Sequence, residues 1–172
     1  MGQIVLVTGG VRSGKSAFAE RYAAHCAETH GAKVAYIATA QVYDEEMRQR
    51  VDLHQLRRPS SWVTYEAPFE TENAIRAAGA EYGVILFDCI TMFLSNDMLQ
   101  YPEEEQERDS FALHVEERIH ALIQAAEEVD ATTIFVTNEV GAGIVPEHRL
   151  GRLYRDMAGL ANQQIARSAA EV

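Results

Sequence analysis

The sequence predicts an α/β doubly wound fold, with a mostly parallel sheet and helices on both of its faces. Short apolar segments rich in β-branched residues alternate along the chain with longer segments of helical periodicity. The strand segments are continuously apolar, as in VILF and TIFV, which is typical of strands buried on both faces of a parallel sheet. In such folds, ligands bind beyond the carboxyl ends of the strands.

Strands and helices are expected in alternation along the chain. The strands are predicted at Gln3–Thr8, Lys33–Thr39, Trp62–Glu66, Val84–Asp88 and Thr132–Thr137. The helices are predicted at about 15–30, 44–57, 69–79, 110–129 and 149–169. The acidic segment 102–109 is expected to be a solvated loop with the acidic first turn of a helix. From its length, residues 1–172 are expected to form a single domain.

The net charge is strongly acidic but unevenly distributed. It is −11 overall, whereas residues 1–60 carry eight Lys or Arg and six Asp or Glu, a charge of +2. The overall acidity argues against a protein that binds nucleic acid nonspecifically or lies on an anionic membrane. A mildly basic first third on an acidic body indicates a local anion site.

The two cysteines and the hydropathy pattern point to a soluble cytoplasmic protein. Cys26 and Cys89 form neither a metal-ligand spacing nor a disulfide framework, so free buried thiols in a reducing compartment are expected. No apolar run approaches the ~18 residues of a membrane span, and the N-terminus lacks a basic leader.

A phosphate-binding loop follows the first predicted strand. The sequence GGVRSGKS fits G-x-x-x-x-G-K-[ST] and leads into a predicted helix, as this motif requires. Its backbone N–H groups can surround a phosphate chain, and the positive end of the helix adds to the same site. The lysine can reach the β- and γ-phosphates, and the serine hydroxyl can ligate Mg²⁺. The candidate nucleotide-binding residues are Gly9, Gly10, Val11, Arg12, Ser13, Gly14, Lys15 and Ser16.

An acidic residue ends the fourth predicted strand. Val84–Asp88 is four apolar residues followed by an acid, the form of a Walker B segment, and we expect it to neighbour the loop-bearing strand. Asp88 would then hold Mg²⁺ directly or through water. In the alternative interpretation, the carboxylate caps a helix that starts near Cys89–Thr91.

The segment DEEMRQRVDLHQLR predicts a helix with a basic face. Arg50, His54, Arg57 and Arg58 fall at i, i+4, i+7 and i+8, so they share one face, and Pro59 ends the helix. The arginines can bind phosphate oxygens, and the neighbouring cations favour a neutral imidazole, a plausible nucleophile at phosphorus. Two alternatives stay open: a solvated basic face, or an imidazole that packs at the edge of the core.

A second glycine-containing loop follows the last predicted strand. Glu139 lies there, ahead of two glycines and Pro146, at the edge where ligands are expected. It can bind substrate, metal or a hydroxyl proton, or the loop can be a simple connection. Three arginines follow at three-residue spacing on a predicted helix, and they either reach phosphate or neutralise the acidic body: Arg149, Arg152 and Arg155.

Together these segments resemble the bifunctional adenosylcobinamide kinase/adenosylcobinamide-phosphate guanylyltransferase family of cobalamin synthesis. The resemblance runs from residue 4 to about residue 167. Its most restrictive parts are YIATAQ, the R-x-x-x-H that precedes RP, and TNEVGAGIVP. The other stretches that carry it are VTGGVRSGKS, WVTYEAP, LFDCITMFLSN and LANQQIA.

The resemblance implies a P-loop NTPase-like fold and two reactions at one nucleotide site. A nucleoside triphosphate, ATP or GTP, phosphorylates the aminopropanol hydroxyl of adenosylcobinamide. GMP from GTP then passes through a covalent guanylyl-histidine, here His54, to adenosylcobinamide phosphate. The resemblance also implies a homotrimer, and a further apolar strand in family members beyond the position of Val172, where this sequence ends.

Two other functions remain open at this point. One is a plain P-loop small-molecule kinase, for which His54 is incidental. The other is a GTP-dependent switch, although neither lysine belongs to an N-K-x-D guanine-reading motif, because Lys15 follows Gly14 and Lys33 follows Ala32.

Overall fold

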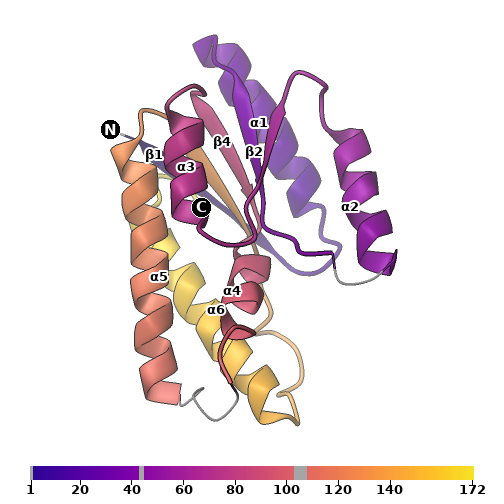
Figure 1. The fold of residues 1–172 in the computed structure, drawn as a ribbon, viewed down its shortest axis with the longest axis vertical. Helices are drawn as coiled ribbons and strands as arrows, with labels where there is room; N and C mark the ends of the chain where they lie inside the picture. The colour runs from indigo at the N-terminus through magenta and orange to yellow at the C-terminus, as the bar shows by residue number, and fades with distance from the viewer. Residues whose placement is uncertain (1, 43–44, 103–107) are drawn as a thin grey trace.

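A sheet of five parallel strands forms the centre of the part of the chain that the structure describes (Figure 1). Its spatial order is β1–β5–β4–β2–β3. The computed structural model describes residues 2–42, 45–102 and 108–172, with all their side chains except those of Glu46, Met47, Arg50, Leu53, His54, Arg57, Arg108 and Asp109. The strands are β1 (Gln3–Gly9), β2 (Val34–Ala38), β3 (Val63–Glu66), β4 (Val84–Asp88) and β5 (Thr132–Asn138).

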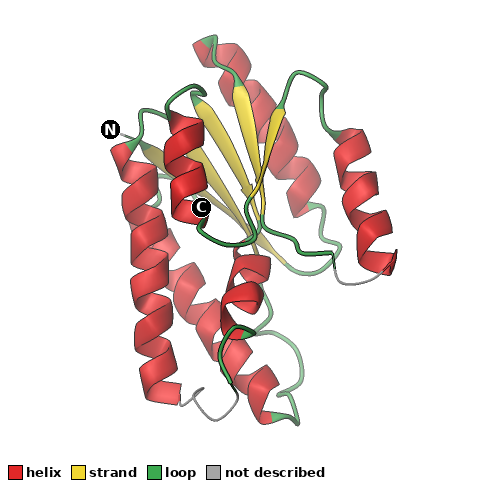
Figure 2. Cartoon of the chain, in the orientation of Figure 1, coloured by secondary structure: helices red, strands yellow, loops and turns green. Residues whose placement is uncertain are grey.

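Helices alternate with the strands and cover both faces of the sheet (Figure 2). On one face, α1 packs against β1, β2, β4 and β5, whereas α3, α5 and α6 pack on the other. In Figure 1, α2 stands at the β3 side of the sheet, apart from the other helices. The helices are α1 (Lys15–His30), α2 (Glu45–Arg57), α3 (Thr71–Gly79), α4 (Ile90–Met98), α5 (Arg108–Glu128) and α6 (Arg149–Ser168).

Burial on both faces explains the continuous apolar runs. Along β1, Ile4 and Leu6 belong to the core beneath α5 and α6, whereas Val5 and Val7 belong to the core beneath α1. Successive side chains of a strand point to opposite faces, so a strand covered by helices on both sides needs apolar residues at every position. The predicted α/β doubly wound class is confirmed, and the sheet is wholly parallel among the described strands.

The predicted strands agree with the structure to within one residue at each end. Among the described residues the predicted helix 44–57 begins at Glu45, and Asp44 lies outside them. The helix α4 was absent from the list of predicted helices, although the alternative interpretation of Asp88 included a helix start near Cys89–Thr91, where α4 begins. Seven of its nine residues are buried, so it shows no amphipathic period that would mark it in the sequence.

One expectation about strand order was wrong. Asp88 ends β4, but β4 does not neighbour β1, because β5 lies between them. Gly9 of β1 pairs in register with Asn138 of β5, and Asp88 of β4 pairs with Val136 of β5. The apolar run of a strand records burial on both faces and carries no information on which strand lies beside it.

The last residues of the chain lie along the free side of β1. The N–H of Ala170 donates to the carbonyl of Ile4 at 2.8 Å, and the N–H of Leu6 donates to the carbonyl of Glu171 at 2.9 Å. These bonds give the parallel bridge between Val5 and Glu171. They continue the hydrogen-bonding pattern of the sheet past β1.

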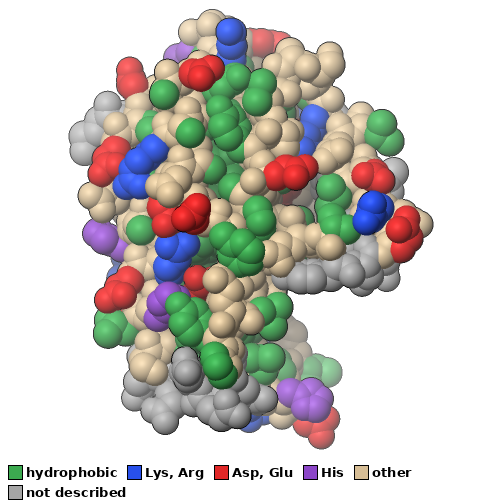
Figure 3. Space-filling view, viewed as in Figure 1, with side chains coloured by type: hydrophobic (Ala, Val, Ile, Leu, Met, Phe, Trp, Pro, Cys, Tyr) green, Lys and Arg blue, Asp and Glu red, His purple; other side chains and the backbone are tan. Residues whose placement is uncertain are grey.

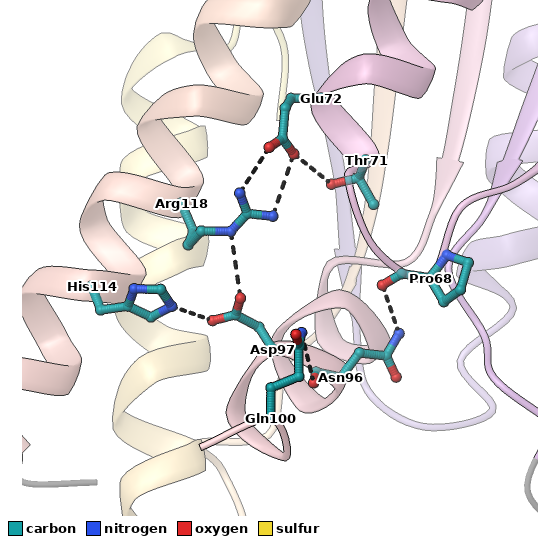
Figure 4. A network of polar contacts seen from close by, with 8 residues as sticks. All are labelled: Pro68, Thr71, Glu72, Asn96, Asp97, Gln100, His114 and Arg118. Carbon is teal, nitrogen blue, oxygen red and sulfur yellow. Dashed lines mark hydrogen bonds and ion pairs between the residues drawn. The ribbon is translucent and has the colours of Figure 1, made fainter. Parts of the chain in front are cut away.

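A charged network joins α3, α4 and α5 (Figure 4). The Arg118 guanidinium binds Glu72, with Nη1 2.8 Å from Oε1, and its Nε lies 3.4 Å from Oδ1 of Asp97. The other oxygen of Asp97 lies 2.7 Å from Nε2 of His114. Because each charge meets an opposite charge or a hydrogen-bonding partner, these half-buried groups tie the three helices together.

Elsewhere the acidic charge is spread over the surface. Figure 3 shows Asp and Glu side chains scattered over this face, with Lys and Arg side chains between them. Among the described residues, no helix is long and apolar enough to cross a membrane.

Candidate active site

The candidate site lies at the carboxyl edge of the sheet, where the strands lead into loops and helices. The loop between β1 and α1 follows the predicted motif. Arg12 and Gly14 adopt the left-handed conformation, with φ of 57° and 88°. The N–H of Phe18 then bonds to the carbonyl of Gly14 at 2.9 Å, which closes the first turn of α1. The predicted strand–loop–helix context of the phosphate-binding motif is therefore present.

In this structure the side chain of Lys15 is hydrogen-bonded to the backbone of its own loop. Its Nζ donates to the carbonyl oxygen of Gly10 at 3.1 Å, across the turn formed by residues 10–13. The ammonium is thus bonded to the loop that the motif predicts to surround a phosphate. A phosphate bound there would offer Nζ a stronger, charged acceptor than the carbonyl.

Next to this loop is a cavity of about 660 Å³. Ser16 of α1, Asp88 of β4 and Arg58 line it, and so do Val51 and Gln55 of α2. Elements far apart in the sequence therefore meet around one space that is large enough for a nucleotide or another ligand of drug size. Of the predicted nucleotide and metal ligands, the cavity brings Ser16, Asp88 and Arg58 together.

Asp88 is held by a tyrosine of the neighbouring strand. The hydroxyl of Tyr36 donates to Oδ2 of Asp88 at 2.8 Å, and Ala38 pairs in register with Asp88. Among the described residues, Oδ1 of Asp88 accepts no hydrogen bond. The cap of α4 is Cys89, so the alternative interpretation of Asp88 as a helix cap is wrong. Burial and the nearby Asp88 carboxylate raise the pKa of the Tyr36 hydroxyl, which keeps it protonated as a donor.

The backbone after Asp88 is fixed by Thr39. The N–H of Cys89 donates to Oγ1 of Thr39 at 2.8 Å, and this hydroxyl donates to the carbonyl of Cys89 at 2.9 Å. Asn96 of α4 in turn donates to the carbonyl of Thr39 at 2.7 Å. It also donates to the carbonyl of Pro68 at 3.1 Å (Figure 4). The loops after β2 and β3 are thereby tied to α4. Burial, with the nearby Asp88, raises the pKa of the Cys89 thiol to about 11.

Arg58 stacks on the tyrosine that holds Asp88. Its guanidinium carbon lies 3.4 Å from the centroid of the Tyr36 ring, and Nη1 donates to Oγ1 of Thr64 at 3.2 Å. Its Nε is buried and has no hydrogen-bond partner among the described residues. A half-buried guanidinium with an unpartnered donor on the wall of a cavity is suited to bind an anion.

Asn138, the last residue of β5, lines the cavity, whereas Glu139 in the following loop turns back onto that loop. The N–H of Gly141 donates to Oε1 of Glu139 at 2.5 Å, and the N–H of Glu139 donates to the carbonyl of Gly9 at 3.0 Å. Nδ2 of Asn138 donates to Oγ1 of Thr91 at 3.2 Å. The second glycine loop therefore packs against the phosphate-binding loop through its backbone.

The arginines of α6 hold this loop in place. Arg155 donates to the carbonyl of Gly141, and Nη1 of Arg152 donates to the carbonyls of Pro146 and Glu147 at 3.0 and 2.6 Å. In this structure these two side chains thus bind backbone oxygens of the loop.

Three predicted residues of α2 have side chains outside the part of the chain that the structure describes. The side chains of Arg50, His54 and Arg57 lie outside the described residues, although their helix, α2, contributes Val51 and Gln55 to the cavity. Conversely, sequence reasoning missed Tyr36, Thr39 and Asn138. Of these three, Tyr36 could have been found from the sequence, because the hydroxyl of a tyrosine within a buried strand needs a hydrogen-bond partner.

Comparison with solved structures defines the class of protein. A KaiC-like protein from Pyrococcus horikoshii OT3 matches with a TM-score of 0.50 and 20% sequence identity, over 91% of this chain and 68% of that chain. This likeness concerns the fold alone. Together with the loop between β1 and α1, it assigns the chain to the P-loop nucleotide-binding proteins.

Comparison of sequences defines the family. The family model described as cobinamide kinase/cobinamide phosphate guanyltransferase matches residues 5–172. The bifunctional adenosylcobalamin biosynthesis protein CobU of Escherichia coli K12 is 40% identical over 98% of this chain and 93% of its own length. The CobP protein of Pseudomonas aeruginosa, with the same description, is 40% identical over 94% of this chain and 86% of its own.

The chain therefore belongs to the cobinamide kinase/cobinamide phosphate guanyltransferase family. It is a bifunctional enzyme of cobalamin biosynthesis, with kinase and guanylyltransferase activities. This confirms the family that the sequence resembles, over a plain small-molecule kinase or a nucleotide-dependent switch.

Proposed function

We propose that both reactions take place at the phosphate-binding loop and the adjoining cavity. A nucleoside triphosphate, ATP or GTP, first phosphorylates the aminopropanol hydroxyl of adenosylcobinamide. GTP then gives its GMP moiety, through His54, to adenosylcobinamide phosphate, which yields adenosylcobinamide-GDP and pyrophosphate. The observation that carries this proposal is the meeting of Ser16, Asp88 and Arg58 around one cavity that α2 also lines.

The guanylyl transfer consists of two displacements at the α-phosphorus of GTP. In the first, a ring nitrogen of His54 attacks, an N–P bond forms, the bond to the β-phosphate oxygen breaks, and pyrophosphate leaves. In the second, a phosphate oxygen of adenosylcobinamide phosphate attacks the same phosphorus, and the N–P bond breaks. On α2, His54 is three positions from Val51, a spacing that brings two residues to one helix face. Because Val51 lines the cavity, this spacing supports the assignment of His54 as the nucleophile.

The phosphate chain is assigned to the loop between β1 and α1. The N–H groups of residues 9–16 and the ammonium of Lys15 would neutralise the charge of the pyrophosphate as it leaves. Arg58 would bind a further phosphate oxygen, which its unpartnered Nε and its place on the cavity wall support. We assign the same phosphate-binding role to Arg50 and Arg57 on sequence spacing, and nucleotide binding to Glu139 on its position in the adjoining loop.

A Mg²⁺ ion fits the oxygen donors of this cavity. Ser16 and Asp88 both line it, and Oδ1 of Asp88 accepts no hydrogen bond from the described residues, so a hydroxyl and a carboxylate oxygen are available. Oxygen ligands of this kind suit Mg²⁺, which commonly bridges one carboxylate, waters and nucleotide phosphates. When bound, the ion would neutralise charge on the phosphates during transfer.

The two reactions require different atoms of the triphosphate at the reacting position. The kinase step needs the γ-phosphate near an acceptor hydroxyl, whereas the guanylyl transfer needs the α-phosphate near His54. We therefore infer that the triphosphate binds in two registers or that α2 moves between the steps. Structures of complexes with GTP analogues that share one phosphate register and one position of α2 would contradict this inference.

We further propose that residues 1–172 act as one nucleotide-binding domain in a cytoplasmic homotrimer. The family resemblance supports the trimer, and sedimentation velocity of the purified chain tests it. A trimer would sediment as a single species of three chain masses, whereas a monomer at all concentrations would contradict this part of the proposal.

Intact-protein mass spectrometry after incubation with GTP and Mg²⁺ tests the covalent step. We expect an acid-labile GMP adduct in the wild type, none in His54→Ala, and an undiminished adduct in His120→Ala, whose imidazole is exposed on α5. Formation of the adduct in His54→Ala would contradict the assignment. In a separate arm, Lys15→Ala should abolish both reactions, and unchanged turnover would contradict the role of the phosphate-binding loop.

A further inference from the structure

Tyr36 contacts both Asp88 and Arg58, two residues of the cavity that lie far apart in the sequence. It lies in the middle of β2 and is only 2% exposed, yet its side chain contacts two charged groups of the cavity. Its hydroxyl donates to Oδ2 of Asp88 at 2.8 Å, and its ring lies beneath the guanidinium of Arg58, with 3.4 Å between the guanidinium carbon and the ring centroid.

We propose that Tyr36 is a positioning residue that orients the Asp88 carboxylate for a divalent cation and holds Arg58 at the cavity wall. This inference rests on the proposed function of the cavity and deepens it. Tyr36 itself touches neither the substrate nor the reacting phosphorus in this scheme. It acts through the two residues that do the binding.

The hydroxyl selects which oxygen of Asp88 faces a cation. A phenol has one proton to donate, and in this structure that proton goes to Oδ2. The carboxylate is thereby fixed with Oδ1 as the oxygen left for a metal. Hydrogen bonds to a ligating carboxylate typically change metal affinity by about 10- to 100-fold when they are removed. The hydroxyl is therefore expected to affect metal binding far more than it affects folding.

The ring restricts Arg58 to one orientation. An arginine side chain has many rotamers, and the stacked ring together with the bond from Nη1 to Thr64 selects one of them. In that orientation Arg58 lines the cavity with its Nε unpartnered among the described residues. Without the ring, the guanidinium would lose the surface against which it packs. Binding of an anion would then have to restrict the arginine to one rotamer, at a cost in conformational entropy.

A purely structural role for Tyr36 makes a different prediction. The residue also packs in the core beneath α1, among residues such as Val34 and Leu86. If packing were its only function, phenylalanine would serve equally well, since it fills almost the same volume and leaves out only the hydroxyl. The variants Tyr36→Phe and Tyr36→Leu therefore separate the hydroxyl, the ring and the packing.

The experiment measures binding of Mn²⁺, as a spectroscopic substitute for Mg²⁺, by electron paramagnetic resonance in the presence of a non-hydrolysable GTP analogue. Binding of the same analogue without metal, in EDTA, is measured in parallel. For Tyr36→Phe we expect about tenfold weaker Mn²⁺ binding, as for loss of a partner to a metal-binding carboxylate. Metal-free binding of the analogue should stay within about twofold, because the ring still supports Arg58.

Three further variants complete the test. Tyr36→Leu should weaken both Mn²⁺ binding and metal-free analogue binding, and Arg58→Gln should weaken metal-free binding alone. Asp88→Asn is the reference for loss of the metal ligand. If Asp88→Asn weakens Mn²⁺ binding and Tyr36→Phe does not, the role of the hydroxyl is wrong and the proposed metal site stands. If neither variant changes Mn²⁺ binding, the proposed metal site is wrong as well. If metal-free binding is the same in Tyr36→Leu as in the wild type, the role of the ring is wrong.

Discussion

Arg118 and Glu72 form a bidentate ion pair between α5 and α3. Nη1 lies 2.8 Å from Oε1 and Nη2 lies 3.3 Å from Oε2, so the planar guanidinium faces the planar carboxylate (Figure 4). Both side chains are mostly shielded, with 24% and 19% of their surfaces exposed. A shielded pair with this geometry contributes more to stability than a solvated one, because removal of one partner leaves the other charge poorly hydrated.

Glu72→Gln is therefore expected to destabilise the fold. We expect the free energy of unfolding to fall by about 1–3 kcal/mol, the range for hydrogen bonds to a charged group. Arg118 keeps its contact with Asp97 in this variant. Urea denaturation followed by circular dichroism measures the loss. Arg76→Gln is the matched control, because Arg76 pairs with Glu128 at the same 2.8 Å but is much more exposed. That change should cost less than about 1 kcal/mol. Equal losses in the two variants would contradict the role of shielding.

The same ion pair makes the stability depend on pH in the acid range. Burial, the largest single cause, would raise the pKa of Glu72, but the hydrogen bonds and charge of Arg118, together with hydrogen bonds from the backbone and Thr71, outweigh it and lower the pKa below the ordinary value of 4.5. The unfolded chain therefore takes up this proton before the folded one does. The contribution of Glu72 is complete above the ordinary pKa and is lost as the pH falls through the lowered value.

A pH series of urea denaturation curves checks this dependence. Between pH 7 and pH 5, the wild type should be more stable than Glu72→Gln by a constant difference. The two free energies of unfolding should converge as the pH falls below the ordinary value of 4.5 and through the lowered one, because protonation removes the charge that the substitution removes. A difference that persists unchanged at pH 3 would show that the pair acts through packing and not through charge.

The sequence was informative for those features of the fold and site that a single local pattern specifies. A continuous apolar run indicates a strand buried on both faces, and GGVRSGKS between a strand and a helix indicates a phosphate-binding loop. Asp88 could be found because it ends such a run. Each of these features is complete within about ten residues, so periodicity and spacing record it.

The remaining features depend on which strands lie side by side. Tyr36 contacts Asp88 only because β2 and β4 pair in register, which neither strand's composition specifies. The position of β5 between β1 and β4 was missed for the same reason. Thr39 and Asn96 act through backbone atoms of distant segments, and α4 is too buried to show a helical period. Long-range contacts of this kind leave no pattern in a single sequence.

Two glycines of the phosphate-binding loop are expected to differ in their tolerance of alanine. Gly14 has a φ of 88°, where a side chain is strained, whereas Gly10 has an ordinary φ and no atom within 4 Å of an added Cβ. Gly14→Ala should cost about 1–2 kcal/mol of stability and distort the start of α1. Gly10→Ala should change the free energy of unfolding by less than about 0.5 kcal/mol.

Nucleotide affinity gives a second measurement on the same pair. Isothermal titration with a GTP analogue should show a larger loss for Gly14→Ala, because the loop N–H groups must point inward together to bind phosphates. Equal affinity and equal stability in the two variants would contradict the role of the left-handed conformation at Gly14.

The Cys89 thiol is expected to be inert in the folded protein, although it follows directly after the proposed metal ligand. It is 9% exposed, and burial together with the Asp88 carboxylate raises its pKa to about 11. Since the thiolate is the reactive form, about one molecule in a thousand carries it at pH 8. Burial also raises the pKa of Cys26, so both cysteines should resist alkylation.

Mass spectrometry after treatment with iodoacetamide at pH 8 tests this expectation. The native protein should remain unmodified over an hour, whereas the protein in concentrated urea should gain two alkyl groups, one for each cysteine. Cys26→Ser should reduce the second number to one, which isolates Cys89. Because the thiol contacts the hydroxyl of Thr91, and the N–H of Cys89 is bonded to Thr39, slow labelling of Cys26→Ser would then report opening of this segment at the start of α4. Labelling that is complete within minutes in the native state would show that the thiol is neither buried nor protonated as the structure requires.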